Sequence, residues 1–395
     1  MSRRIRLAVF ASHPIQYQAP IWRGLARRAE VDLLVHYFSD TSVRGGVDPG
    51  FGVPVAWDQP LLEGYQTVFL SRGANLDRPL TVTIPHFEDY LRERRFDAVF
   101  FHGYEYAFEL QLRRFAKSLR LPLIMRPELS TIATTGRLRR SARSLYRRWF
   151  YAGVSAFAVI GEQARRSLSE DGVPSHKMFF SPYAVDSELF EANSGILDRD
   201  ACRRRLGIPS DRFMLLFSGK LLPQKNASLV LRALERWPVP ARIVFVVVGD
   251  GPERSRLERE GKRLLGGDFL LAGFKNQSEL APYFKAADAL VLPSLHETWG
   301  LVVNEAMHFG LPVIVSDRVC CLADLLENRE TGLVFRSDDA GDLARALHQI
   351  MENDHLRQQF SRNVRRVIQE YTPDRAANGI LNAVEKALEI TSPAG

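Results

Sequence analysis

The chain has 395 residues, of which 46% are hydrophobic and 25% charged, and its net charge is +7. This length suits two domains better than a single core, and the composition argues against an intrinsically disordered protein. No apolar run approaches the roughly 20 residues needed to cross a bilayer, so we expect no membrane-spanning helix.

The positive charge is concentrated in the first half of the chain. Residues 1–190 hold 26 Lys and Arg against 19 Asp and Glu, whereas the remainder holds 27 of each. We therefore expect a negatively charged partner to meet the N-terminal half. The three cysteines, Cys202, Cys320 and Cys321, lack metal-ligand spacing and indicate free thiols in a reducing compartment.

The beginning of the chain faintly resembles a signal peptide, because the basic residues 3–6 precede the apolar segment Leu7–Ala11. That apolar segment is too short for a signal peptide, and His13-Pro14 follows it where a cleavage site should be. We therefore interpret it as the first strand of a cytoplasmic protein.

Strand-like and helix-like segments alternate along the chain, which is typical of parallel sheets flanked by helices. The first half is expected to form strands at Arg6–Phe10, Val31–Phe38, Ala98–Phe101, Leu123–Met125 and Ala156–Val159, with helices such as Ile21–Ala29 and Phe87–Arg94. The second half is expected to form strands at Met214–Phe217, Ile243–Val248, Phe269–Leu271, Ala289–Leu292 and Pro312–Val315. Its expected helices are Ala227–Glu235, Glu253–Leu265, Ser278–Ala286 and Gly300–Phe309, followed by a long helical stretch.

This alternation predicts an α/β protein with two Rossmann-like domains. We place the N-terminal domain at 1–190, a polar linker at 191–210 and the C-terminal domain at 211–372. Two such domains enclose a cleft, and ligands favour the carboxyl ends of the strands that border it.

Three segments of the second half follow predicted strands and suit a phosphate-containing ligand. Gly249-Asp250-Gly251-Pro252 permits a tight turn and close backbone approach, although such glycines can also be purely structural. The segment from Gly219 to Asn226 carries Lys220 and Lys225, whose charges suit a diphosphate unless they are simply solvated loop lysines.

The segment His296–Ala306 gives the strongest signal. Gly300 and Leu301 open a helix whose free amides suit a phosphate, with Trp299 just before it. Glu297 lies in the preceding loop and Glu305 inside the helix, so two carboxylates can face one ligand from different depths. A solvated helix face explains Glu305 poorly, because its neighbours are apolar.

The spacing of these two glutamates after a strand resembles the retaining glycosyltransferases of family 4, which have the GT-B fold of two Rossmann-like domains facing a deep cleft. The resemblance covers nearly the whole chain and is most specific between Met214 and Phe335. It implies that Glu297 binds donor-sugar hydroxyls, Glu305 the ribose, and Lys220 and Lys225 the diphosphate. It also implies that the last helix, within 373–395, returns to the N-terminal domain.

The resemblance assigns further residues. The predicted catalytic residues are His102, Glu297, Lys220 and Lys225. The predicted donor site comprises Gly219, Lys220, Lys225, Gly249, Gly251, Phe274, Glu297, Trp299, Gly300, Leu301 and Glu305. The predicted acceptor site comprises His13, Tyr17, Arg126 and Glu128. Two departures stand out: His13–Pro20 lacks the family's usual glycine pair, and Cys320-Cys321 replaces a common glycine.

A basic segment, Arg137–Phe150, is expected to form an amphipathic helix. It suits anionic lipid or an anionic acceptor, and equally a solvated helix covering the sheet. Nucleic acid is not expected, because the aromatic residues do not form a stacking platform.

The resulting prediction is a metal-independent hexosyltransferase without a cofactor, which moves a sugar from a nucleoside diphosphate sugar to a hydroxyl acceptor with retention. The acceptor is expected to be a glycan or a lipid-linked molecule of cell-surface polysaccharide, lipopolysaccharide or glycolipid synthesis, met in the cytoplasm or at the inner face of the membrane. The alternatives are a sugar-nucleotide epimerase of the same architecture and a non-catalytic nucleotide-sugar-binding module.

Overall fold

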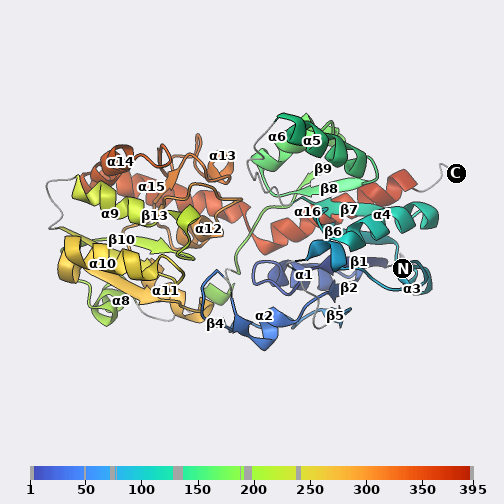
Figure 1. Ribbon diagram of the computed structural model, residues 1–395, viewed down its shortest axis with the longest axis horizontal. Coiled ribbons are helices and arrows are strands. Elements are labelled where there is room, and N and C mark those ends of the chain that lie inside the picture. Colours follow the sequence, from blue (N-terminus) through green and yellow to red (C-terminus); the bar gives the residue numbers. More distant parts are fainter. Residues whose placement is uncertain are drawn as a thin grey trace. The chain divides into compact units, whose positions relative to one another are not determined.

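The computed structural model describes residues 4–391 except 49, 72–75, 77, 128–136, 187, 191–197 and 237–241. The chain folds into two compact units (Figure 1). The first consists of Met1–Arg44, Pro60–Ala184 and Thr372–Gly395, and the second of Gly45–Gln59 and Val185–Tyr371. Residues 45–59 and the last helix therefore each join the unit that does not contain their neighbours in sequence.

A sheet of seven parallel strands forms the centre of the first unit, in the order β5-β2-β1-β6-β7-β8-β9. The strands are β1 Ile5–Ala11, β2 Val31–Tyr37, β5 Gln66–Phe69, β6 Ala98–His102, β7 Leu123–Arg126, β8 Ala156–Val159 and β9 Met178–Phe180. The strands after β1 are first added on one side of it, as β2 and β5, and then on the other side, from β6 onward, so the strand order reverses between the neighbours β1 and β6. Such a switch point opens a crevice at the carboxyl ends of the strands.

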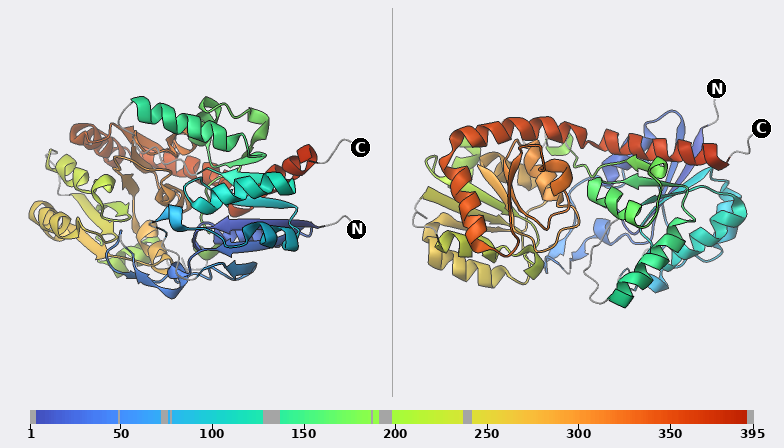
Figure 2. Two further views of the ribbon diagram at one scale, coloured as in Figure 1. Left: turned by 45° about the vertical axis from the view of Figure 1, so that its right-hand side comes forward. Right: turned by 90° about the horizontal axis from the view of Figure 1, so that it is seen from above.

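Helices cover both faces of this sheet. They are α1 Ala19–Ala26, α3 Phe87–Arg94, α4 Ala107–Leu119, α5 Arg137–Tyr151, α6 Glu162–Glu170 and α16 Pro373–Thr391, with the short α2 at Thr41–Arg44. Figure 2 shows the last helix, α16, running along the first unit. Its small residues Ala376 and Ala377 enter the core, and a Cβ added to Gly379 would lie 2.0 Å from the Phe180 carbonyl oxygen. Glycine is therefore required where α16 approaches β9.

The second unit contains six parallel strands in the order β12-β11-β10-β13-β14-β15. They are β10 Phe213–Ser218, β11 Ile243–Val248, β12 Phe269–Gly273, β13 Ala289–Leu292, β14 Val313–Ser316 and β15 Gly332–Phe335. The order is that of a dinucleotide-binding sheet, with its switch point between β10 and β13. The expected α/β class with two parallel sheets is thus confirmed, and the predicted strand ends agree within two residues.

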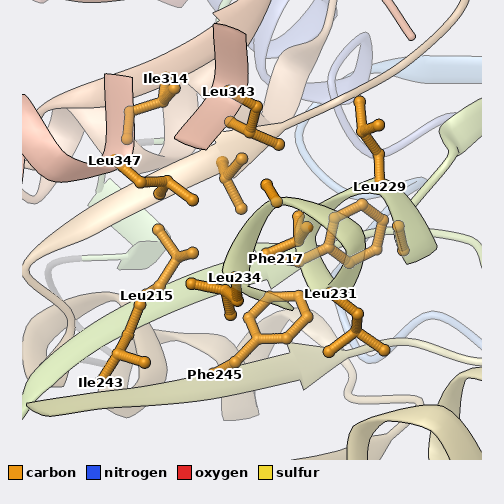
Figure 3. Close-up of a cluster of buried hydrophobic side chains, with 14 of the residues drawn as sticks. Leu215, Phe217, Leu229, Leu231, Leu234, Ile243, Phe245, Ile314, Leu343 and Leu347 are labelled. Atoms are coloured by element: carbon orange, nitrogen blue, oxygen red, sulfur yellow. The ribbon is translucent and has the colours of Figure 1, made fainter. Parts of the chain in front are cut away.

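The helices of the second unit are α8 Arg199–Leu206, α9 Ser228–Glu235, α10 Arg254–Leu265, α11 Gln277–Ala286, α12 Leu301–His308, α13 Leu322–Leu325, α14 Ala340–Glu352 and α15 Asp354–Val367. One core lies between the sheet and α9, α10 and α14. Figure 3 shows Leu215 and Phe217 of β10 and Phe245 of β11 packed against Leu231 and Leu347 of the covering helices. Because side chains alternate across a strand, the other face of the sheet remains for α11 and α12.

Helix α8 lies within the expected linker 191–210, of which residues 191–197 lie outside the described part. It is fixed to the second unit by Arg203, whose buried guanidinium pairs with Asp288 at 2.6 Å and donates to the Ala286 carbonyl at 3.0 Å. None of the helices within the described ranges is both long and apolar enough to span a membrane.

Candidate functional site

Predicted ligand-binding residues gather at the switch point of the second sheet. Lys220 and Lys225 follow β10, and Glu297 follows β13, the strand beside it. The Lys225 ammonium forms an ion pair with the Glu297 carboxylate, to which the Ser294 hydroxyl also donates at 3.4 Å. The lysine and glutamate side chains are only 23% and 15% exposed. A cation and an acceptor thus stand side by side where a ligand with phosphate and hydroxyl groups would meet both.

Lys220 has a different partner. Its ammonium donates to both oxygens of Asp48, at 2.8 and 3.0 Å, and lies 4.8 Å from the centre of the Phe51 ring. Both partners belong to residues 45–59, which group with the second unit. The two predicted diphosphate lysines are therefore each neutralised by a carboxylate of this unit.

Glu305 lies in the middle of α12 and is reached by the amide of Gln277, 3.5 Å away, at the start of α11. Its side chain is partly accessible, yet desolvation raises its pKa to about 7, opposed only by the hydrogen bond from Gln277. A glutamate that keeps its proton near neutrality is poised to change charge when a polar ligand arrives.

The start of α12 agrees with the prediction in its backbone but not in its tryptophan. Gly300 adopts φ +95° as the residue before the helix, and Leu301 is the first helical residue. Trp299 is buried, and its indole donates to the Asn304 side chain at 2.8 Å. The structure thus places the Trp299 side chain in the interior, where it fixes the loop carrying Glu297.

The predicted donor-site glycines serve the packing of neighbouring loops. A Cβ on Gly249 would lie 1.9 Å from the Gly219 carbonyl oxygen, and one on Gly251 would lie 2.7 Å from that of Leu221. The Gly249 amide also donates to the Gly273 carbonyl at 2.8 Å. The loops after β10, β11 and β12 are therefore joined to one another by close backbone contacts. A structural role thus accounts for the two glycines of the Gly249-Asp250-Gly251-Pro252 segment.

Phe274, a predicted donor-site residue, follows β12 and contacts two aromatic rings of the segment 45–59. The ring centres of Phe274 and Phe51 lie 4.8 Å apart, and those of Phe274 and Trp57 lie 6.3 Å apart. The three rings are half-buried. Flat aromatic surface therefore adjoins the lysine at the end of β10.

In the first unit, His102 ends β6 at the switch point with β1. Its ring packs against those of Phe100 and Trp22, with centres 5.3 and 6.0 Å away. Burial, with a smaller effect from the charge of Arg126, lowers the pKa of His102 to about 3. The imidazole is therefore neutral at physiological pH and is unsuited to donate a proton as a cation.

The predicted acceptor residues are separated by burial. Arg126 is fully buried and donates to the carbonyls of Ser181 and Pro182, each at 3.0 Å. This placement favours a structural role for Arg126 over acceptor binding. Tyr17 is half-exposed against Tyr183, with ring centres 5.2 Å apart. His13, half-exposed beside Ser12, completes the described members, and Glu128 lies outside the described residues.

The basic segment forms α5, as expected. Among its described side chains, Leu145 and Trp149 are 71% and 49% exposed, whereas Phe150 is buried. Arg147 makes two hydrogen bonds to the Asp171 carboxylate, at 2.6 and 3.1 Å. The helix therefore fixes part of its charge to the protein and leaves apolar surface exposed.

Sequence reasoning missed Asp48, Phe51 and Trp57 near the β10 lysines. Two aromatic residues within a short Gly- and Pro-containing loop are an available signal, but nothing in the sequence links that loop to the second half of the chain.

Comparison with known proteins identifies the family. Residues 198–367 match the glycosyl transferases group 1 family, and residues 14–184 match the glycosyl transferase 4-like domain. The chain belongs to the group 1 glycosyltransferases. The resemblance to family 4 is thereby confirmed, and each unit of the chain corresponds to a known domain of the family.

Individual relatives agree with this assignment. The chain is 30% identical over 217 residues to the D-inositol 3-phosphate glycosyltransferase of Thermomonospora curvata, a match that covers 52% of this chain and 50% of the relative. The chain spans about half the length of the curated relatives it matches. Sucrose-phosphate synthase from Thermosynechococcus elongatus has the same fold, with a TM-score of 0.70, 19% identity and coverage of 98% and 100%. HepE from Anabaena, solved in complex with UDP, has a TM-score of 0.74, 15% identity and coverage of 97% and 99%. The fold of this chain is thus GT-B.

Proposed function

We propose that this glycosyltransferase moves a hexosyl residue from a nucleoside diphosphate sugar to a hydroxyl acceptor, with retention and without a metal ion. The observation that carries the proposal is the Lys225–Glu297 pair at the β10/β13 switch point, with Lys220 in the same loop as Lys225 and Glu305 in the helix that follows Glu297. A diphosphate can take the cation, which leaves Glu297 to accept hydrogen bonds from the sugar hydroxyls.

In this proposal the bond between the anomeric carbon and the phosphate oxygen breaks while the acceptor oxygen bonds to the same face of that carbon. The acceptor proton passes to the departing phosphate. Lys225 and Lys220 stabilise the negative charge that develops on the leaving diphosphate, and the α12 amides add to this. His102 is neutral because of its burial and supplies no charge to this step.

Uridine diphosphate is the first nucleotide to test, because HepE was solved with it. Calorimetric titration with UDP, GDP and ADP, with and without EDTA, should give one preferred nucleotide whose affinity is indifferent to EDTA. Lys225→Ala should abolish that binding. Lys262→Ala is the matched control, since Lys262 is 65% exposed on α10 and forms an ion pair with Glu258 of its own helix.

Activity is tested with the preferred donor class and membrane or glycan extracts. Transfer to an acceptor supports the proposal, whereas conversion of the donor sugar without acceptor would indicate an epimerase. Binding without any turnover would indicate a binding module. No nucleotide binding in the wild-type protein would overturn the proposal.

We also propose that the acceptor is a glycan or lipid-linked molecule of cell-surface glycoconjugate synthesis, met at an anionic membrane by α5. The exposed Leu145 and Trp149 beside basic residues support this. Flotation with vesicles containing phosphatidylglycerol should be weakened by Leu145→Ser and by Arg143→Glu. Equal flotation of both variants and the wild type would count against it.

A further inference from the structure

Residues 45–59, called here the strap, lie in the sequence between two segments of the first unit but belong to the second unit. They form a hairpin of β3 Gly46–Val47 and β4 Pro54–Val55. The far end of the strap is tied to the start of α11, because the Asn276 side chain donates to the Ala56 carbonyl at 2.7 Å. The Asp58 carboxylate also accepts from the amide of Ser278 at 3.2 Å and from its hydroxyl. The strap is therefore fixed by specific hydrogen bonds.

At its other end the strap encloses the Lys220 side chain. Asp48 takes both hydrogen bonds from the ammonium and also accepts from the amides of Gly50 and Phe51, at 2.8 and 2.9 Å. Desolvation opposes ionisation of Asp48, but the bonds from Lys220 and these amides together lower its pKa. A Cβ on Gly50 would lie 2.6 Å from the Lys220 Cδ, so the turn lies directly against the lysine. A carboxylate, a bare backbone and an aromatic ring thus surround this one cation.

A phosphate oxygen and the Asp48 carboxylate compete for this cation. Both are anions, and the ammonium already donates two hydrogen bonds to Asp48. The Lys220 side chain is 35% exposed, so a phosphate that reaches the ammonium lies beside the carboxylate and is repelled by its charge unless the phosphate displaces it. The aromatic rings of Phe51, Trp57 and Phe274 lie beside it and give a nucleobase, but not a bare phosphate, further surface to contact.

We propose that Asp48 is a specificity-determining residue of the donor site, which occupies the phosphate position on Lys220 until a nucleoside diphosphate displaces it. This inference rests on the proposed function. Inorganic pyrophosphate, which has no base to bind the aromatic rings, binds weakly because the carboxylate competes with it. The nucleotide overcomes that competition through its base.

The test compares Asp48→Asn with Asp58→Asn in calorimetric titrations with pyrophosphate and with UDP. Asparagine at position 48 can still accept from the two turn amides, so the turn is kept while the charge is lost. Both variants remove one negative charge from the strap, but Asp58 does not touch Lys220. We expect Asp48→Asn to tighten pyrophosphate binding about tenfold, because the charge-assisted hydrogen bond between Asp48 and Lys220 no longer competes with the ligand. The same substitution should tighten UDP binding by a smaller factor. Asp58→Asn should leave pyrophosphate binding within about twofold.

A double-mutant cycle supplies the second readout. In a Lys220→Met background, Asp48→Asn should no longer change pyrophosphate affinity, because the ammonium for which Asp48 and the phosphate compete is absent. Equal or weaker pyrophosphate binding by Asp48→Asn, or equal tightening by Asp58→Asn, would overturn the inference while leaving the donor site intact if UDP still binds in a Lys225-dependent manner. Absence of UDP binding to the wild type would overturn the proposed function and this inference with it.

Discussion

Replacing Glu305 by glutamine should make the stability of the second unit less sensitive to pH. Burial raises the folded-state pKa of Glu305 from 4.5 to about 7. Between these values the unfolded chain has released the proton that the folded protein still holds. Unfolding is therefore favoured as the pH rises, and the stabilisation present below 4.5 is lost as the pH passes through 7.

The expected magnitude follows from this interval. A difference of one pKa unit corresponds to about 1.4 kcal/mol, so the full interval corresponds to about 3 kcal/mol. Glu305 retains some accessible surface, which lets water screen the carboxylate, and we therefore expect about 2 kcal/mol. Glutamine has nearly the same shape and can still accept from Gln277, but it does not ionise.

The assay is urea denaturation of both proteins between pH 4.5 and 8.5. The difference in unfolding free energy, variant minus wild type, should rise through this range and level off above pH 7, since all other titrating groups cancel in it. If the two units unfold separately, the transition that UDP shifts identifies the second unit. A difference in unfolding free energy that is the same at every pH would refute the burial-raised pKa of Glu305. Such a constant offset would indicate that the substitution altered packing alone.

Three further substitutions test the fold. Arg203→Met should lower the unfolding free energy by about 2 to 4 kcal/mol, because the carbonyls of Ala286 and Arg212 lose their buried donor while Asp288 keeps its ion pair with Arg199; a loss below about 1 kcal/mol in urea would contradict this. Gly249→Ala should cost about 2 kcal/mol or more and weaken nucleotide binding, since φ is +141° and the Gly219 carbonyl oxygen fills the Cβ position; unchanged melting would speak against it. His36→Phe should make the unfolding free energy less sensitive to acid, because burial lowers the pKa of His36 to about 4. As the pH falls from 6.5 to 4, the wild type should lose about 3 kcal/mol of unfolding free energy relative to the variant. Parallel pH profiles of the two proteins would exclude this.

The architecture of the two sheets could be predicted because their central strands are continuous apolar runs bounded by turn residues. Ile243–Val248 and Ala289–Leu292 agree with the structure residue for residue. The strands β9 and β15 were not predicted, because both are short, lie at sheet edges and are partly exposed. An edge strand of three or four residues carries too little pattern to distinguish it from a loop.

The sequence could not show which of the predicted site residues are buried. Arg126 and Trp299 were assigned to the acceptor and donor sites from the resemblance to the family, yet both are buried and hydrogen-bonded within the protein. Whether a side chain after a strand points outward or inward depends on the elements that cover it. Those covering elements are set by the tertiary fold and leave no mark in the local sequence.

The pairing of site residues depends on strand order in the same way. Lys225 and Glu297 are 72 residues apart, but each follows a strand at the switch point, so the strand order alone brings them together. Asp48 and Lys220 are 172 residues apart, and no strand order explains their contact. It arises because the strap leaves one unit and folds with the other. The Lys225–Glu297 pair is expected wherever this sheet carries these residues, whereas the Asp48–Lys220 pair depends on the path of the strap in this chain. Removing the charge of Asp48 is therefore more informative about donor selectivity than removing the charge of Glu297.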